Sequence, residues 1–227
     1  MTEAAVKTDQ VVTVGIVDDH HVLTEALSLV IRREPDLRVV GTADSCAAAR
    51  TLFGRTCPDV ILLDVSLPDG NGLSLVPEFK RICQDTYILV LTSLTDEKTL
   101  LRAINTGVSG FIGKNRPLVE VLAAIRQAAE GEIVMPSSLL VGLLARTPRG
   151  RPDSPDQQKY EPLTPREEEL LRYMAQGKSG KSIAAELSIS HMTVRTHIRN
   201  LMGKLGVHSR LEAVTFALQH GLIEPPT

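Results

Sequence analysis

The stretch "VILLDVSLPDG", from Val60 to Gly70, places four aliphatic residues directly before the carboxylate of Asp64. A short apolar run without polar alternation is typical of a strand buried on both faces of a parallel sheet. An ionised carboxylate is costly to bury unless a partner or a cation compensates for it. We therefore expect Asp64 either to stand at the open end of such a strand or to have a cation nearby, and "SLPDG" to turn the chain away.

The same kind of apolar run recurs along the first half of the chain, separated by longer amphipathic stretches. The other expected strands are residues 12–17, 37–41, 87–92 and 109–113. The expected helices are residues 20–34, 44–54, 72–83, 95–106 and 117–130. Five strand–helix units in succession predict a doubly wound α/β domain with a five-stranded parallel sheet and right-handed crossovers.

The second half of the chain has a different character. Residues 135–146 have the pattern of one short helix, and residues 147–162 contain four prolines and no apolar periodicity. The proline-rich stretch is typical of a linker, with an ordered surface loop as the alternative. The predicted divisions are an α/β domain at 12–132, a linker at 133–160 and a helical domain at 161–226.

The helical domain begins with a strong start signal. Thr164 is a candidate N-cap, Pro165 takes the first helical position, Glu167 follows three residues after the cap, and Gly177 marks the end. Three more helical patterns follow before residue 224. The sequence therefore predicts a small bundle of four helices.

Composition excludes several classes of protein. The 227-residue chain is 43% hydrophobic and 23% charged, with a formal net charge of −2. No apolar run approaches the ~20 residues of a membrane span, and the N-terminus lacks a signal-peptide pattern. The three cysteines form no CxxC pair, so reduced thiols in a cytoplasmic protein fit better than a disulfide framework or a zinc site.

Polar residues follow the expected strands at their carboxyl ends, where ligands bind in such sheets. Asp18 and Asp19 come at the end of the first strand, Asp64 at the end of the third and Thr92 at the end of the fourth, and Lys114 follows the fifth. Clustered carboxylates repel one another unless a cation intervenes, and hard oxygen ligands suit Mg²⁺. A carboxylate beside a metal, a hydroxyl and an ammonium is a plausible acceptor for a phosphoryl group.

The motifs "IVDDH", "VILLDVSLPDGNG", "VLTS" and "GFIGK" resemble those of the receiver domain of bacterial two-component response regulators. The resemblance implies that a sensor histidine kinase phosphorylates Asp64. It further implies that Mg²⁺ is held by Asp18, Asp19, Asp64 and the backbone carbonyl of Ser66. Thr92 and Lys114 would contact the phosphoryl group, and Phe111 would be the aromatic switch position. The alternative for Phe111 is a plain core residue of the fifth strand.

A basic segment distinguishes the helical domain. Residues 178–210 contain six Lys or Arg against one Glu, a local charge of +5. Val194, Ile198, Leu201 and Leu205 recur at helical spacing, so residues 192–205 are expected to dock one face on the bundle. The preceding "SIAAELSIS" supplies a short helix and a turn. This layout is a helix-turn-helix with 192–205 as recognition helix.

Residues 163–223 resemble the LuxR-type helix-turn-helix domain through "LTPREEELL", "GKSGKSIAAELSIS", "TVRTHIRNLMGKLGV" and "GLI". Together the two domains resemble the NarL/FixJ group of response regulators. The resemblance implies a transcription regulator that binds double-stranded DNA, forms a homodimer when phosphorylated and acts with the transcription machinery. It suggests base contacts from Arg195, Thr196 and Arg199, and phosphate contacts from Thr193 and Lys204.

Three other interpretations compete with this one. A haloacid-dehalogenase-like phosphatase also uses an aspartate and Mg²⁺, but it needs a second Asp two residues after the first, where this chain has Ser66. A protein-interaction module would not bind duplex DNA. An atypical receiver would keep the fold without the phosphorylation. The complete set of carboxylates, hydroxyl and Lys favours a phosphorylated regulator that is not an enzyme.

Overall fold

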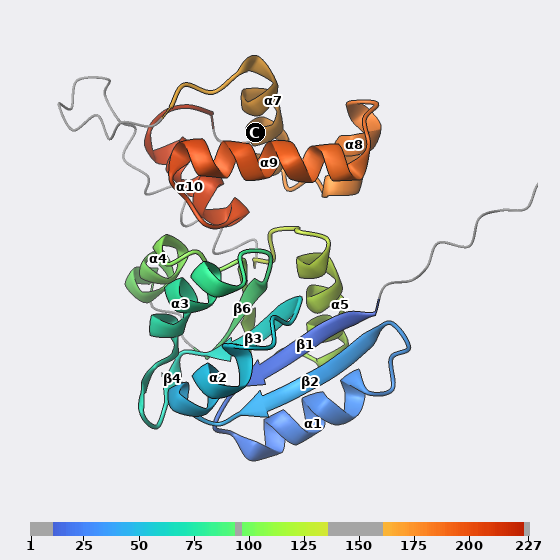
Figure 1. Ribbon diagram of the computed structural model, residues 1–227, viewed down its shortest axis with the longest axis vertical. Coiled ribbons are helices and arrows are strands. Elements are labelled where there is room, and N and C mark those ends of the chain that lie inside the picture. Colours follow the sequence, from blue (N-terminus) through green and yellow to red (C-terminus); the bar gives the residue numbers. More distant parts are fainter. Residues whose placement is uncertain (1–10, 94–96, 136–160, 225–227) are drawn as a thin grey trace, which may run out of the picture.

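The computed structural model describes residues 11–93, 97–135 and 161–224, and it forms an α/β part and a helical part (Figure 1). The α/β part is built on five parallel strands that stand in the order β2-β1-β3-β6-β7. Their bounds are β1 Val12–Val17, β2 Leu37–Ala43, β3 Val60–Asp64, β6 Tyr87–Thr92 and β7 Gly110–Gly113. The five-stranded doubly wound sheet is therefore confirmed.

Helices cover both faces of this sheet, because each of the four crossovers carries one and a fifth follows β7. They are α1 His21–Ile31, α2 Cys46–Phe53, α3 Leu75–Ile82, α4 Glu97–Asn105 and α5 Leu118–Ala129. Leu27 of α1 and Ile125 of α5 belong to one apolar cluster. Phe53 of α2, Phe79 of α3 and Ile104 of α4 belong to another. Each face of the sheet thus has its own core.

All five residues of β3 are buried, and the strand lies between β1 and β6. After it, "SLPDGN" forms a hairpin of β4 Ser66–Leu67 and β5 Gly70–Asn71, followed by a short 3-10 helix at Gly72–Ser74. The Asp69 carboxylate accepts hydrogen bonds from the backbone N–H groups of Cys46 and Ala47 at 2.7 and 2.9 Å. The loop after Asp64 is therefore tied to the start of α2.

The cysteine prediction is wrong for two of the three residues. Cys57 and Cys83 form a disulfide with their Cα atoms 5.5 Å apart, whereas Cys46 is free and buried. Cys57 precedes β3 and Cys83 follows α3. A strand and its return helix bring these two positions to the same end of the unit, although 26 residues separate them in sequence. Motif spacing alone could not show that proximity.

The helical part comprises α7 Pro165–Ala175, α8 Gly180–Glu186, α9 His191–Leu205 and α10 Arg210–Gln219. The expected capping box is present: Glu167 N–H donates to Thr164 Oγ1, and Thr164 N–H donates to Glu167 Oε2 at 2.8 Å. Gly206 ends α9 in the left-handed conformation, with φ +67°. The four helices share one apolar cluster.

The expected short helix at 135–146 and the linker at 147–162 lie almost wholly outside the described residues. Within the residues that are described, no helix is both long enough and apolar enough to cross a membrane.

Candidate phosphoryl-acceptor site and nucleic-acid interface

The carboxyl edge of the sheet brings the predicted carboxylates together. Asp18 follows β1 directly and Asp64 ends β3, and the side chains of both are buried, at 1% and 4% residue exposure. Asp19 lies beside Asp18 and is half-buried. Because β1 and β3 are adjacent parallel strands, their ends place these residues side by side. The expected convergence is therefore present for all three aspartates.

Lys114 joins the two buried carboxylates. Its Nζ lies 2.8 Å from Asp18 Oδ2 and 2.7 Å from Asp64 Oδ2. Burial acts to lower the pKa of Lys114, but the hydrogen bonds to Asp18 and Asp64 outweigh burial and raise it. The ammonium therefore stays charged and compensates for the carboxylate that ends the apolar strand.

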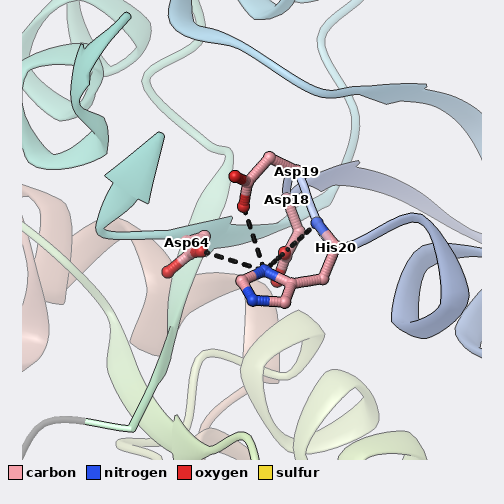
Figure 2. Close-up of side chains that lie close together, drawn as sticks. All are labelled: Asp18, Asp19, His20 and Asp64. Carbon is pink, nitrogen blue, oxygen red and sulfur yellow. Dashed lines mark hydrogen bonds and ion pairs between the residues drawn. The ribbon is translucent and has the colours of Figure 1, made fainter. Parts of the chain in front are cut away.

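His20, which was not among the predicted site residues, completes the cluster. Its Nδ1 lies 2.9 Å from Asp18 Oδ1 and 3.0 Å from Asp19 Oδ1, and 3.9 Å from Asp64 Oδ2. Figure 2 shows the three carboxylates converging on this one ring nitrogen. The sequence signal that could have placed His20 at this site is its position directly after Asp18 and Asp19. The backbone N–H of His20 donates to Asp18 Oδ1 at 2.9 Å, which fixes this turn.

The other predicted site residues lie along the same edge or just behind it. Thr92, the last residue of β6, is buried. Its backbone carbonyl accepts a hydrogen bond from the backbone N–H of Lys114 at 2.9 Å. Ser66 is exposed, and its N–H donates to Asp64 Oδ1 at 3.2 Å. Phe111 is buried in the core with Ile104. The Phe111 side chain is therefore packed inside the α/β part in this conformation.

The donor set can hold a metal ion. Asp18, Asp19, His20 and Asp64 each offer one ligand atom, and these atoms lie within 4.8 Å of one another. Three of the four ligands are carboxylate oxygens, which suit a hard divalent cation better than a soft one.

The helical part contains the predicted helix-turn-helix. Ser190 caps α9: its Oγ accepts the Thr193 N–H at 3.0 Å. The α9 face formed by Val194, Ile198 and the two leucines of the predicted stripe is buried in the bundle. This confirms the expected docking face and leaves the predicted nucleic-acid contacts on the remaining sides of the helix.

The five predicted DNA-contact residues differ in their present contacts. Thr196 Oγ1 donates to the Met192 carbonyl at 3.1 Å, and Thr193 Oγ1 lies 2.8 Å from Ser190 Oγ. Lys204 Nζ donates to Glu167 Oε2 at 2.7 Å. The two arginines behave differently, because both face the α/β part of the chain.

Arg199 forms an ion pair with Asp85, at 2.5 Å between Nη2 and Oδ1. Arg195 and Arg199 line a cavity shared by both parts of the chain. The other basic residues of its lining are Lys80, His208 and Arg210. The arginine-bearing face of α9 is therefore turned toward the α/β part in this conformation.

Further contacts hold the two parts together. Leu211, at the start of α10, belongs to the apolar cluster that includes Ile104 of α4. Lys181 of α8 pairs with Glu130, which follows α5. Arg210 is only 9% exposed, and no hydrogen bond or ion pair joins its side chain to another described residue. Burial accordingly lowers the pKa of Arg210.

Comparison with known protein families separates the chain into the same two parts. Residues 14–126 match the family described as the response regulator receiver domain. Residues 161–217 match the family of bacterial regulatory proteins of the luxR type.

Curated relatives match the chain over nearly its full length. The uncharacterized transcriptional regulatory protein YhcZ of Bacillus subtilis is 35% identical over 91% of this chain and 95% of its own. The DNA-binding transcriptional activator DevR/DosR of Mycobacterium tuberculosis is 34% identical over 95% of this chain and 98% of its own.

Solved structures have the same fold. A two-component response regulator of the LuxR family from Aurantimonas sp. SI85-9A1 is 26% identical, with a TM-score of 0.53, over 57% of this chain and 93% of its own. RcsB from Salmonella enterica serovar Typhimurium, bound to a promoter in the presence of a phosphomimetic, is 22% identical. It covers 92% of this chain and 98% of its own, with a TM-score of 0.54.

Proposed function

The chain belongs to the response regulators that join a receiver domain to a LuxR-type DNA-binding domain, and we propose that phosphorylation of Asp64 switches its binding to DNA. One observation carries the proposal: Lys114 contacts both Asp18 and Asp64 at the open edge of the sheet. A second supports the switch, because Arg199 of α9 is paired with Asp85 of the receiver part.

The Asp64 carboxylate is the proposed phosphoryl acceptor. It stands at the end of β3, with Thr92 at the end of the next strand, and Lys114 within hydrogen-bond distance. Attack of a carboxylate oxygen on the phosphohistidine of a sensor kinase would form the acyl phosphate and break the P–N bond. The Lys114 ammonium and the Thr92 hydroxyl would then hold the phosphoryl oxygens.

Mg²⁺ is the proposed metal of this site, held by Asp18, Asp19, Asp64 and the backbone carbonyl of Ser66. The oxygen-rich donor set supports this choice. When bound, the ion would neutralise carboxylate charge and that of the incoming phosphoryl oxygens. His20 Nδ1 lies against the carboxylates of Asp18 and Asp19, so its imidazole would have to move for those oxygens to bind the ion.

The labelling experiment for Asp64 is direct. Acetyl phosphate with Mg²⁺ should label the wild type, and Asp64→Asn should remain unlabelled. Asp44→Asn removes an exposed carboxylate outside the site and should label normally. Equal labelling of Asp64→Asn and the wild type would refute the acceptor assignment.

DNA binding is assigned to α9, with base contacts from Arg195, Thr196 and Arg199, and phosphate contacts from Thr193 and Lys204. Arg199 cannot pair with Asp85 and read a base at the same time, so α9 must leave the receiver before DNA is bound. To shift the population from 1:99 to 99:1, phosphorylation must favour the released state by about 5.5 kcal/mol. Released chains would dimerise on half-sites about one helical turn apart.

Specific binding tests the assignment of the recognition helix. Genome-wide mapping with the wild type supplies the bound sequence, and Arg199→Ala should lose preference for it over a mixed-sequence duplex. Arg172→Ala changes a basic residue of α7, paired with Glu168, and should keep the preference. Unchanged preference in Arg199→Ala would count against base reading by this residue.

The remaining assignments follow from the family. We propose a cytoplasmic regulator with a sensor histidine kinase and the transcription machinery as partners, and with domain limits of 12–132 and 161–226. We also propose that it is not an enzyme. Ser66 occupies the position where a phosphatase of the haloacid-dehalogenase type carries its general acid, so the acyl phosphate should persist. Steady turnover of small phosphate esters would contradict this.

A further inference from the structure

The disulfide between Cys57 and Cys83 closes one end of the β3–α3 unit, and one of its two cysteines is exposed to solvent. Cys57 is exposed, and Cys83 is buried. The third cysteine, Cys46, is buried and free. A thiol from another molecule can therefore approach the cross-link only from the side of Cys57.

The cross-link anchors the turn at residues 83–86. The Thr86 N–H donates to the Cys83 carbonyl at 3.1 Å, and Thr86 Oγ1 donates to the Pro58 carbonyl at 2.7 Å. Cys83 and Thr86, at the two ends of this turn, are thus attached to Cys57 and Pro58, which are neighbours. Of these two attachments, only the disulfide is covalent.

Asp85 lies inside this anchored turn and contacts the recognition helix. Its Oδ1 accepts a hydrogen bond from Arg199 Nη2 at 2.5 Å, across 114 residues of sequence. Gln84 and Asp85 also line the cavity into which Arg195 and Arg199 face. The position of Asp85 therefore bears directly on whether α9 stays docked.

We propose that Cys57 and Cys83 form a site of reversible thiol–disulfide exchange, and that the cross-linked form favours docking of α9 on the receiver. The effect on DNA rests on the proposed function, in which α9 must leave the receiver to bind. Disulfides of cytosolic proteins are commonly transient and redox-sensing rather than structural. An exposed cysteine in such a bond, next to a regulated contact, fits that use.

The reaction partner is a dithiol, either a small molecule or a dithiol protein. Its thiolate attacks the sulfur of Cys57, which forms a mixed disulfide and releases Cys83 as a thiolate that takes up a proton. The second thiol of the partner then attacks the mixed disulfide and releases Cys57. Two electrons and two protons pass to the chain, and the partner leaves as a disulfide. A disulfide partner drives the reverse reaction.

Reduction leaves Thr86 and its hydrogen bonds in place but removes the covalent anchor of the turn. The Asp85–Arg199 pair is largely exposed, with side-chain exposures of 66% and 63%. Exposed pairs contribute little, so its loss should raise the DNA affinity of the unphosphorylated chain by roughly two- to five-fold. The expected response is a modest tuning of the switch.

Counting thiols tests the exchange site by itself. After oxidation by a small disulfide and labelling in denaturant, the wild type should carry one label, on Cys46. After treatment with dithiothreitol it should carry three. Three labels in the oxidised sample, or a disulfide mapped to Cys46, would overturn the proposal whatever the chain does with DNA.

Binding to a mixed-sequence DNA duplex at low salt tests the coupling. The oxidised wild type should bind more weakly than the reduced one, and a Cys57→Ser/Cys83→Ser variant should bind like the reduced form in both conditions. Cys46→Ser is the matched control and should keep the redox response. Asp85→Asn should still form the disulfide but lose most of the response.

The outcomes separate this proposal from the proposed function. Equal affinity of the oxidised and reduced wild type, with DNA binding intact, would overturn the redox coupling alone. No binding to the duplex in any redox or phosphorylation state would refute the DNA switch and, with it, the coupling. A response that persists in the double-serine variant would place its origin outside the disulfide.

Discussion

Lys80 gives a quantitative test of the packing between the receiver and the helical part. The side chain is buried on α3, and its Nζ donates to the Thr86 carbonyl at 2.8 Å. Burial lowers the pKa of Lys80 from 10.5 to about 8, and the carboxylates of Asp85 and Glu212 only partly oppose that shift. Glu212 belongs to α10, so both parts of the chain contribute to this environment.

The pKa shift converts into a dependence of stability on pH. The drop from 10.5 to about 8 corresponds to roughly 3 kcal/mol, since one pKa unit is worth about 1.4 kcal/mol. Between these two pH values the unfolded chain binds the proton that the folded chain has lost, so folding gains stability as pH rises. Below pH 8 Lys80 is protonated in both states, and the folded state bears the full cost of burying its charged ammonium.

The assay compares the wild type with Lys80→Met by urea denaturation from pH 7 to pH 10.5, with the receiver transition fitted separately. The free energy of unfolding of the wild type should rise by about 3 kcal/mol relative to Lys80→Met across that range. Lys178→Met, which changes a half-buried lysine of the helical part, should run parallel to the wild type. Parallel curves for Lys80→Met would refute a depressed pKa and thus the burial argument.

Three further changes test other contacts. Gly72→Ala should destabilise the receiver by about 1–3 kcal/mol or more in urea and reduce labelling by acetyl phosphate, because a Cβ there would lie 2.0 Å from the Asp64 carbonyl oxygen. Reduction of the disulfide, which spans 26 residues, should lower the free energy of unfolding by about 3.5 kcal/mol. Lys204→Met should lower the free energy of unfolding of the helical part by roughly 1–3 kcal/mol, because the hydrogen bond to Glu167 is lost. If Lys204 also contacts a DNA phosphate, the slope of log binding constant against log salt concentration should flatten by about one.

Much of the receiver could be predicted because its sequence signals are local. Apolar runs define the strands, and parallel strands bring their carboxyl ends to one edge, so the meeting of Asp18, Asp64 and Lys114 followed from chain order alone. The start of α7 was equally local, since the capping box needs only Thr164 and Glu167.

The parts that could not be predicted depend on three-dimensional placement. The position of His20 depends on how the chain turns from β1 into α1, and the Cys57–Cys83 bond depends on where α3 ends relative to β3. The pairing of Arg199 with Asp85 depends on how the two parts dock. No spacing in the sequence encodes such contacts.

The docked state is held weakly enough for a phosphoryl group to release it. Burial of Leu211 contributes about 1.5–3 kcal/mol, and the largely exposed Arg199–Asp85 and Lys181–Glu130 pairs add at most about 1 kcal/mol each. Arg210 works against docking, because enclosing its charged side chain carries a desolvation cost, which also lowers its pKa. The sum lies below the roughly 5.5 kcal/mol needed for a complete reversal of a 1:99 population. The docking surface includes α4, which follows β6, so the proposed shift of Thr92 toward a phosphoryl group would act on the helix that contacts α10. Removing Leu211 from that contact should therefore imitate phosphorylation, and Leu211→Ser should bind DNA without it.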